Sequence, residues 1–487
     1  MSKRKKVISD SLFLYASHFL DKARGLFLIP ILIKTVGIES YAVFIQILVN
    51  IQMLIPFTSL AMGQSFYRYT SKLDDSDTDS LGIEFWTVFL TSFFLSLFGA
   101  IFLFLLSPII SHYILHDLGL KALRLSSFLL ITRTVYGVLS KFLEARKRFK
   151  SYSILSSIFH ILPILGLTLG VFLYKDIVTG VLFYVLCEML LITFLFSMIL
   201  LRWDFPFKFI DVHVLKKFLK YSAPLIPSSI STGILSKIDR YFIGYFLGPA
   251  SMGIYNIVYS VCSLVDSYTF PFNKYYQTYL PKIWDSGKQK GALRQLKIGS
   301  AYYLILAIGS ILGLMIVFDP MVVLVLHKDI PIIINPELTI LIVGLGILIN
   351  GFNRFNFKLV KLEEKNYYIL LADGIAASAN IILNFFLIPV YGILGAAFAT
   401  LISYSIISIL LNSKYSIGID YLYIKNVAKI TLASMSILIL LLFDIFIIDS
   451  YLKLVAVILL GTLFYSIGLF ALKVFSLHDV LMFFKNR

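Results

Sequence analysis

The sequence predicts an all-α polytopic membrane protein with about 14 transmembrane helices. The chain of 487 residues is 59% hydrophobic and only 14% charged, with a mean hydropathy of +0.88, whereas soluble proteins are roughly half apolar and a quarter charged. Apolar stretches of about 20 residues, the length that a helix needs to cross a bilayer, recur along the whole chain. Each is far longer than the roughly 10 residues of a membrane barrel strand, so we expect the spans to be helices.

The first apolar stretch follows a basic start, Lys3 to Lys6, and runs into Asp21, Lys22 and Arg24. It lacks a small-x-small cleavage site, so we interpret it as a span and not as a removed signal peptide. The connections that follow are short, and the largest outer one covers 319–335, so no extramembrane domain is expected. In chain order the predicted spans are 11–33, 41–62, 83–106, 121–139, 153–173, 178–201, 221–246, 252–280, 298–318, 336–357, 367–388, 393–411, 428–448 and 454–472.

Basic residues set the predicted orientation. With the N-terminus in the cytoplasm, the cytoplasmic connections hold about 30 of the 43 Lys and Arg residues and the outer ones about 6. The positive-inside rule therefore places both termini in the cytoplasm. It also explains the net charge of +16. Charges dispersed over short loops form no basic groove, which argues against nucleic acid as a partner. The richest inner loops, 141–150 and 282–297, are expected to rest on anionic headgroups.

Metal or disulfide chemistry is not predicted. Cys187 and Cys262 lie inside apolar runs, as small buried thiols do. The acidic run from Asp74 to Asp79 resembles the start of a calcium loop, but Ser80 stands where such a loop needs Gly, and Trp86 where it needs Glu. We therefore expect a solvated loop there.

A weak internal repeat divides the chain. GIESYAVF at 37–44 aligns with GPASMGIY at 248–255, and TGVLFYV at 179–185 aligns with LGAAFAT at 394–400. The two offsets, 211 and 215 residues, are nearly equal. They predict two six-helix lobes in parallel orientation, as in many transporters. The predicted lobes are 1–215 and 216–412, followed by two added helices in 413–487.

Charged residues inside the spans are the candidate functional residues, because a Lys, Arg or Asp at the bilayer centre costs about 2.5–3.5 kcal/mol on insertion scales. Most must face a bundle interior or a wet cavity, pair with one another or snorkel. The candidate cavity cations are Arg24, Arg133, Lys237 and Arg240, the candidate coupling or balancing acids are Asp21, Asp239, Asp266 and Asp373, and the candidate polar lining comprises Gln46, Asn50, Asn256, Asn380 and Asn384.

The alternative is that these charges only join helices, as ion pairs within the bundle. This alternative is favoured for Lys22, Lys274 and Arg354, which lie near span ends or are able to snorkel, and Asp444 is expected to be structural. A cavity role is favoured for Arg24, Lys237 and Arg240, which lie in the opening helix of each lobe. Cations in a cavity favour an anionic substrate, since Arg offers bidentate donors to phosphate and Lys a point charge.

Pro224 and Pro227 interrupt the seventh span near its cytoplasmic end. Proline removes a backbone hydrogen bond, and Ser228, Ser229 and Ser231 can partly replace it, so the helix is able to bend there. A hinge that gates the cavity and a static kink are both compatible with this pattern.

Two segments resemble a known family. KFLKYSAPLIPSSISTGILSKIDRYFIGYFLGPASMGIYNIVYS, from Lys217, and NIILNFFLIPVYGILGAAFATLISYS, from Asn380, are similar to bacterial polysaccharide-repeat flippases, the O-antigen, capsule and exopolysaccharide transporters of the multidrug/oligosaccharidyl-lipid/polysaccharide superfamily. The resemblance implies a V-shaped, MATE-like transporter of the bacterial inner membrane. Its implied substrate is an oligosaccharide repeat unit linked by diphosphate to undecaprenol. It also implies that cavity cations, here Arg24, Lys237 and Arg240, meet the diphosphate.

The expected function is therefore flipping of a lipid-linked glycan, without covalent chemistry and without a cofactor. Coupling to protons, sodium or the membrane potential stays open, as does partnership with a polysaccharide polymerase and glycosyltransferases. The alternatives are a lipid II flippase or a drug antiporter of the same superfamily, and a membrane-embedded glycosyltransferase or polymerase. The 319–335 loop and its edge offer such an enzyme few catalytic groups, namely Asp319, His327, Asp329 and Glu337.

Overall fold

The computed structural model describes residues 3–326, 335–417, 421–438 and 450–474, and side chains from Leu28 onward apart from several positions in α5, α10, α11 and α15. Within these ranges the regular structure is helical. The chain forms two compact units, Met1–Asn256 and Ile257–Arg487. The expected boundaries at 215/216 and 412/413 stay predictions.

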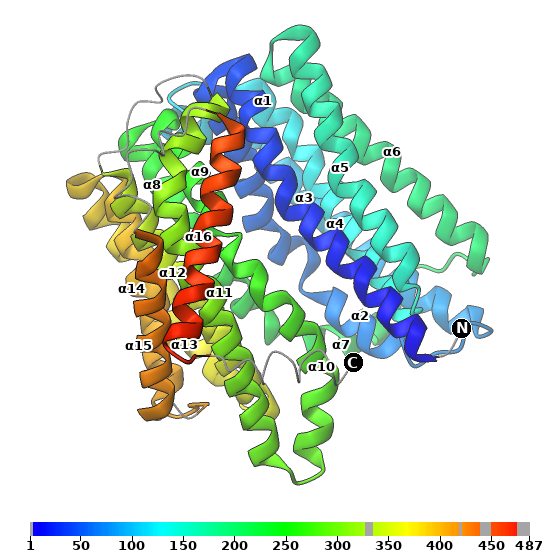
Figure 1. The fold of residues 1–487 in the computed structure, drawn as a ribbon. Coiled ribbons are helices and arrows are strands. Elements are labelled where there is room, and N and C mark those ends of the chain that lie inside the picture. Colours follow the sequence, from blue (N-terminus) through cyan, green and yellow to red (C-terminus); the bar gives the residue numbers. More distant parts are fainter. Residues whose placement is uncertain (1–2, 327–334, 418–420, 439–449, 475–487) are drawn as a thin grey trace. The chain divides into compact units, whose positions relative to one another are not determined.

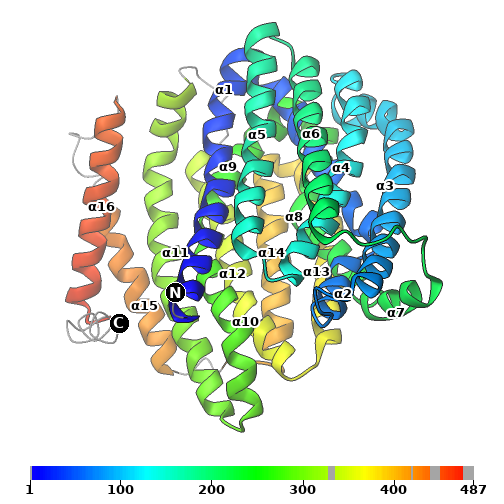
Figure 2. The ribbon, with the colours of Figure 1, turned by 90° about the vertical axis from the view of Figure 1, so that its right-hand side faces the viewer.

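The first unit contains eight helices and the start of a ninth (Figure 1). The longest, α1, packs against α3, α4, α5 and α8, and α5 and α6 form an antiparallel hairpin beside it in both views (Figures 1 and 2). In chain order these helices are α1 (Lys3–Ser59), α2 (Met62–Thr70), α3 (Thr78–Ile114), α4 (Leu120–Ala145), α5 (Phe149–Tyr174), α6 (Ile177–Trp203), α7 (Val212–Ser222), α8 (Leu225–Leu247) and α9 (Pro249–Cys262).

The second unit takes the end of α9 and the remaining helices. The α13–α14 hairpin packs on α12, and α15 and α16 pack on α11 around Ile305, Val317, Ile430 and Val457. The helices are the 3₁₀ helix η1 (Val265–Thr269), α10 (Phe270–Asp285), α11 (Gln289–Leu326), α12 (Pro336–Leu362), α13 (Asn366–Tyr391), α14 (Ile393–Asn412), α15 (Tyr421–Met435) and α16 (Tyr451–Ala471).

Ten helices in the described part of the chain are long and apolar enough to cross a membrane. They include α3 to α6, α11 to α14 and α16, together with Leu28–Ser59 of α1. Helix α8, with its three charges, and the short α9 are not among the ten. The all-helical, multi-pass membrane fold is therefore confirmed, whereas the count of fourteen spans stays a prediction.

The aligned segments of the weak repeat have matching local structures. Gly37 interrupts α1 with φ 85° and ψ 170°, and Gly248 separates α8 from α9 with φ 84° and ψ 172°. Both conformations are readily available only to glycine. Gly180 and Gly395 each lie at the start of the second helix of a hairpin. An added Cβ would stand 2.5 Å from Val171 at the first and 2.3 Å from the Leu387 carbonyl oxygen at the second. An internal repeat accounts for both agreements.

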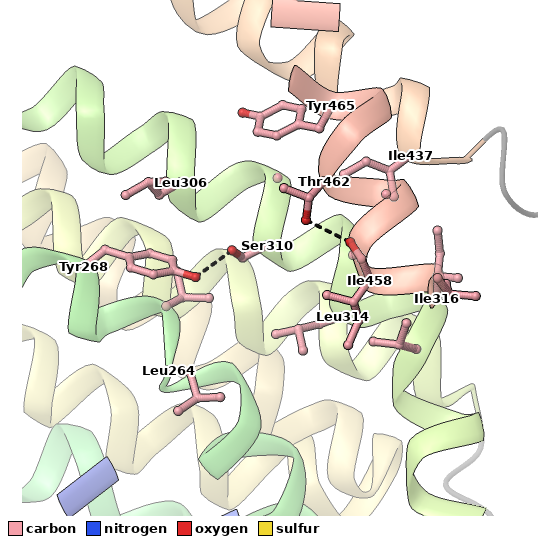
Figure 3. Close-up of a pocket in the computed structure, with 16 residues that line it drawn as sticks. Leu264, Tyr268, Leu306, Ser310, Leu314, Ile316, Ile437, Ile458, Thr462 and Tyr465 are labelled. Atoms are coloured by element: carbon pink, nitrogen blue, oxygen red, sulfur yellow. Dashed lines mark hydrogen bonds between the residues drawn. The ribbon is translucent and has the colours of Figure 1, made fainter. Parts of the chain in front are cut away.

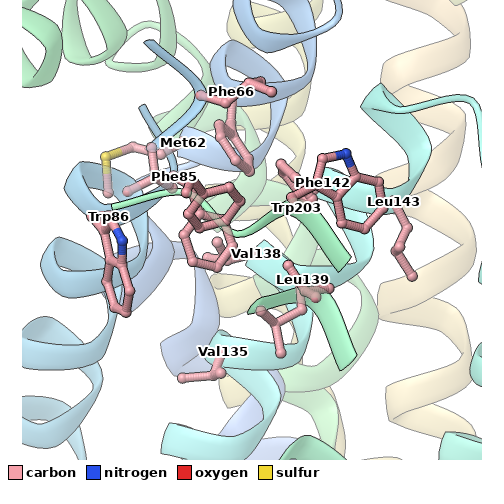
Figure 4. Close-up of a cluster of buried hydrophobic side chains, with 14 of the residues drawn as sticks. Met62, Phe66, Phe85, Trp86, Val135, Val138, Leu139, Phe142, Leu143 and Trp203 are labelled. Carbon is pink, nitrogen blue, oxygen red and sulfur yellow. The ribbon is translucent and has the colours of Figure 1, made fainter. Parts of the chain in front are cut away.

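Three connections meet at one end of the first unit. α2 and α7 pack together there on an aromatic cluster that includes Phe66, Phe85, Phe142 and Phe218 (Figure 4). The guanidinium of Arg146, after α4, donates 2.8 Å to Asp75. The connections after predicted spans 2, 4 and 6 therefore share one side, as alternating spans require.

The acidic run at this end has structural contacts. Asp75 accepts from Arg146, and Asp77 caps α3 by accepting from the Ser80 backbone N–H at 3.1 Å. Asp211 caps α7 in the same way, accepting from the backbone N–H groups of Val214 and His213, and these bonds hold the pKa of its exposed carboxyl below the usual range. The cap is therefore kept until the pH falls below the ordinary range of an aspartate.

Candidate functional site

The charges of α8 form a buried cluster in the first unit. The Arg240 guanidinium donates to Asp239 Oδ1 at 2.6 Å and to the Ser236 carbonyl oxygen at 2.9 Å. Tyr255 of α9 donates from its hydroxyl to the other carboxylate oxygen of Asp239 at 2.7 Å, and its ring lies under the guanidinium. Both Asp239 and Arg240 are buried. The arrangement neutralises a cation and an acid inside the protein and ties α8 to α9.

The predicted polar lining of the first unit connects the same helices. Gln46 donates to Asn50 at 2.7 Å, and the Tyr241 hydroxyl of α8 donates to the same Asn50 oxygen at 2.6 Å. Asn256 of α9 donates to the Tyr41 hydroxyl at 2.8 Å. Gln46 and Asn50 are thus joined to Tyr241 of α8, and Asn256 of α9 is joined to Tyr41 of α1, so both sets act as contacts between helices.

Arg133 lies away from this cluster, in an ion pair between α4 and α6. Its guanidinium approaches Glu188 to 2.6 Å, and the Tyr184 hydroxyl is a second partner. Thr132 donates to the remaining Glu188 oxygen at 2.7 Å. Because Glu188 is fully buried and both of its oxygens are bonded, the pair has the features of a structural contact between helices.

The other predicted residues of the first unit are placed as follows. Lys237 is half-buried on α8. Pro224 lies in the break between α7 and α8, and Pro227 lies in the first turn of α8, so the predicted interruption of the helix is present. The side chains of Asp21 and Arg24 lie outside the described part of the structure.

The second unit holds a more exposed charge pair at a break in a predicted span. Span 252–280 is not one helix: α9 ends at Cys262, the 3₁₀ helix η1 follows, and α10 begins at Phe270. Asp266 lies in η1, and its Oδ2 accepts from the guanidinium of Arg354 of α12 at 2.7 Å. Among the described residues, Asp266 Oδ1 and Ser267 Oγ have no hydrogen-bond partner. Discontinuous helices with polar groups at the break are typical of transporter sites.

The sequence prediction does not include Arg354 among the candidate cavity cations, although the structure favours it as one. Its side chain is 38% exposed, against 15% for Arg133 and 0% for Arg240. A half-exposed arginine is able to offer donors to an anion while Asp266 keeps it in place. The sequence predicts Arg354 near the inner end of a span, and in the structure α12 continues beyond it to Leu362.

The polar residues of α13 face its hairpin partner. Asn380 donates to Ser403 of α14 at 3.1 Å, and Asn384 donates to the Asn380 oxygen at 3.1 Å. Asp373 is buried on the same helix. In the described structure these two asparagines act as contacts within the α13–α14 pair.

An apolar pocket of about 400 Å³ lies beside η1 in the second unit (Figure 3). Leu264 and Tyr268 line it from the η1 side, Gly313 from α11, and Ile458 and Thr462 from α16. The Tyr268 hydroxyl is engaged with Ser310 at 2.9 Å. Such a lining suits a hydrocarbon chain better than a sugar.

Two proteins of known sequence are similar to this chain at low identity. Teichuronic acid biosynthesis protein TuaB of Bacillus subtilis is 21% identical over 208 residues, 43% of this chain and 42% of TuaB. The chain thus spans less than half the length of that relative. An uncharacterized membrane protein of Methanocaldococcus jannaschii, MJ1068, is 22% identical over 438 residues and 83% of each chain.

Solved structures share the fold. The lipid II flippase MurJ in an inward closed conformation superposes with a TM-score of 0.72 at 19% identity, over 93% of this chain and 97% of MurJ. The MATE multidrug transporter DinF-BH superposes with a TM-score of 0.58 at 15% identity, over 85% and 97% of the two chains. The family model described as polysaccharide biosynthesis protein matches residues 7–275, more than half of the chain. By this match, the chain belongs to the polysaccharide biosynthesis protein family, within a fold shared by MurJ and the MATE transporters.

Proposed function

We propose that this protein is a flippase that moves an undecaprenyl-diphosphate-linked oligosaccharide repeat unit from the inner to the outer leaflet of the bacterial cytoplasmic membrane. The observation that carries the proposal is the family match over residues 7–275. Likeness to MurJ supports a transporter fold. The proposed orientation, with both termini in the cytoplasm, rests on the distribution of Lys and Arg.

The intramembrane charges support an anionic substrate. The barrier to flipping is the passage of a charged, sugar-bearing headgroup through hydrocarbon, and polar side chains inside the protein lower it. Arg24, Lys237 and Arg240 of the first unit are the proposed contacts of the diphosphate. Within the second unit, Arg354 is a proposed anion contact because its side chain is 38% exposed. The apolar pocket beside η1 matches the polyprenyl chain in its chemistry.

The driving force is proposed to be electrical or ionic. Moving one negative charge out of a negative-inside cell is favourable by about 2.3 kcal/mol per 100 mV. Proton or sodium antiport would need an acid that changes its charge, and Asp239, Asp266 and Asp373 are the proposed candidates. No cofactor and no covalent step are part of the mechanism. A polymerase and glycosyltransferases of the same pathway are the proposed partners.

Deletion of the gene tests the proposal. The deleted strain should lose its surface polysaccharide and accumulate the lipid-linked repeat unit on the cytoplasmic leaflet, with unchanged drug susceptibility and normal viability. Loss of viability would instead favour lipid II as substrate, and increased drug susceptibility would favour a drug antiporter. Normal display of the polysaccharide, with no accumulated precursor, would contradict the flippase function.

Substitutions test the proposed cation contacts. Arg24→Ala should abolish display at normal protein levels. Arg240→Ala should abolish it as well, and its protein level is measured in parallel because the substitution leaves Asp239 without its cation. Lys290→Gln, in the exposed first turn of α11, should leave display unchanged. Survival of display in both arginine variants would show that these cations do not hold the diphosphate.

A further inference from the structure

The connector between α6 and α8, residues 204–222, exposes large apolar side chains although it does not span the membrane. Its first part, the strap of residues 204–212, is largely irregular. Phe205 points into the buried aromatic cluster, but Phe207, Phe209 and Val212 are 55%, 81% and 56% exposed. Phe207 packs edge-on against Trp86 at 4.7 Å, and Phe209 lies 5.2 Å from Phe207. Three exposed apolar side chains on so short a strap indicate that the strap contacts an apolar environment.

The second half of the connector carries a basic stripe. Helix α7 buries Phe218 and Ser222 against α2, with Tyr69 stacked on Phe218 at 5.3 Å. The opposite face bears exposed groups at helical spacing, His213, Lys216, Lys217 and Lys220. Lys217 is partly engaged, 3.4 Å from Glu84 and over the Tyr69 ring. Lys216 and Lys220 lie on the outward face beside it.

The strap and the stripe lie next to the ends of membrane-spanning helices. Trp86 is near the start of α3, and Trp203 ends α6, so the exposed phenylalanines continue an aromatic group at the ends of these two membrane-spanning helices. Aromatic side chains gather at membrane interfaces because one part of them prefers hydrocarbon and the other the polar boundary. Lysines beside such a belt reach the headgroups.

From this juxtaposition we infer that residues 204–222 form an interfacial anchor, in which Phe207, Phe209 and Val212 insert into the bilayer boundary and Lys216 and Lys220 bind anionic lipid headgroups. An acidic protein would also match the lysines, but it would leave the three apolar side chains of the strap in water. The lipid surface satisfies both halves of the connector. This inference is independent of the transported substrate.

Fluorescence quenching in lipid nanodiscs tests the apolar half. Phe209→Trp places a tryptophan on the strap at a position exposed enough to leave the fold intact, and the parent's emission from its three native tryptophans is subtracted. Brominated lipid should quench most of the added emission. The matched control is Ser76→Trp, in the exposed acidic loop at the same end of the unit, which should stay unquenched. Absence of quenching in the Phe209→Trp variant overturns the anchor.

A second arm tests the headgroups. In the Phe209→Trp variant, brominated phosphatidylglycerol should quench the added emission more strongly than brominated phosphatidylcholine at equal mole fraction. Lys216→Gln with Lys220→Gln should remove this difference, since each basic residue near an anionic surface favours such lipids roughly fivefold. The control is Lys288→Gln with Lys290→Gln, which removes the same charge outside the connector. This control should preserve the difference in quenching between the two lipids. Equal quenching by both lipids in the Phe209→Trp variant with its lysines unchanged would overturn the headgroup role. The basic stripe would then be better explained as a binding surface for an acidic protein.

Discussion

Asp239 and Arg240 are adjacent in sequence and neutralise each other in space. Arg240 is fully buried and held by Asp239, the Ser236 carbonyl and the ring of Tyr255. A buried ion pair contributes little net stability, but removal of one partner is costly, because it leaves the other charge uncompensated in a medium of low dielectric constant. Loss of function in a single Arg240 variant would therefore have two explanations, a lost substrate contact or a lost fold.

A double substitution separates the two explanations. Arg240→Ala should lower the free energy of unfolding by about 3–5 kcal/mol, because Asp239 then lacks its cation. Arg240→Ala combined with Asp239→Ala should recover most of this loss, measured as thermal unfolding in detergent. If the double variant is stable but displays no glycan, the Asp239–Arg240 pair has a role in transport beyond stability. If it also restores display, Arg240 is structural.

Arg354 offers a cleaner test, because it is more exposed and its carboxylate partner is on another helix. Arg354→Gln should reduce glycan flipping at least tenfold, as expected for loss of an interaction of about 1.4 kcal/mol or more with a phosphate. Its stability should change by less than that of Arg240→Ala, since a third of the side chain is solvated. The measurement is transport of a labelled lipid-linked glycan in proteoliposomes.

Asp266→Asn provides the control for Arg354. It removes the charge that holds the guanidinium but leaves Arg354 present, so we expect weaker substrate affinity with part of the maximal rate retained. Equal, complete loss in both variants would indicate that the pair is needed for folding or for the break at η1, and normal transport in Arg354→Gln would exclude it as an anion contact.

Part of the candidate site could be predicted at the level of single residues. Helical spacing correctly groups Gln46 with Asn50, and Asn380 with Asn384, because residues four apart share a face. Spacing within one helix carries no information on the partner helix. The pairing of Arg133 with Glu188, and of Arg354 with Asp266, depends on contacts 55 and 88 residues apart, which a single sequence does not encode in any local pattern.

At the scale of elements, two glycines mark equivalent interruptions. Gly37 and Gly248 have the same extended, positive-φ backbone, and each precedes a helix that the repeat aligns. The sequence alone predicts a loop between the spans at 33–41. In the structure the interruption in this range is the single non-helical residue Gly37, at which two helical segments of α1 meet in a kink. Glycine adopts this backbone readily, so no longer loop is needed there.

Alanine at these glycines should destabilise the protein. Gly37→Ala meets no atom within 4 Å, so its cost is conformational alone, about 1–3 kcal/mol for an L-residue forced into this extended, positive-φ region. Gly248→Ala should cost somewhat more, since its Cβ would also approach the His116 ring to 3.3 Å. Gly374→Ala, in the middle of α13 with open space around it, should stabilise by up to about 1 kcal/mol. Thermal unfolding of the three variants measures the order of their stabilities. An unfolding temperature of Gly37→Ala equal to that of the parent protein would contradict the prediction.

The hydropathy of the sequence does not reveal the break in the predicted span at η1. Residues 252–280 are apolar enough to be predicted as one helix. The 3₁₀ segment itself contains neither glycine nor proline, but Pro271 follows it in the first turn of α10. Proline has no N–H to bond the carbonyl four residues earlier, so a continuous helix through Ser267 is disfavoured. Tertiary contacts, among them Tyr268 with Ser310 and Asp266 with Arg354, also hold the segment. Element type was therefore predictable from composition, and Pro271 was the local signal of this interruption.

At the scale of the whole molecule, the fold class follows from hydropathy because a bilayer allows few solutions. Backbone groups in hydrocarbon must pair internally, so long apolar stretches become helices whatever their side chains are. The alternation of spans then brings the even-numbered connections of the first unit to one end, where Arg146 and Lys217 meet Asp75 and Glu84. Substrate selection has no such constraint, and it depends on the shape and polarity of cavities that only the assembled helices form.

The apolar pocket of the second unit gives the final prediction. If it holds the hydrocarbon part of a lipid-linked substrate, filling it should slow flipping without unfolding the protein. Gly313 lines the pocket, and a Cβ added there meets nothing within 4 Å. We therefore expect Gly313→Leu to occupy part of the pocket and also to improve helix propensity by about 1 kcal/mol.

Gly374→Leu is the matched control, because this glycine is also inside an apolar helix with open space around it but does not line the pocket. Both variants should keep or raise the unfolding temperature, and only Gly313→Leu should lose transport of the lipid-linked glycan in proteoliposomes. A water-soluble analogue that carries the same diphosphate and sugar but a short chain should bind both variants equally, since it does not need the pocket. Equal transport by the two variants would show that the hydrocarbon chain stays in the bilayer, which would leave recognition to the headgroup and the cations that meet it.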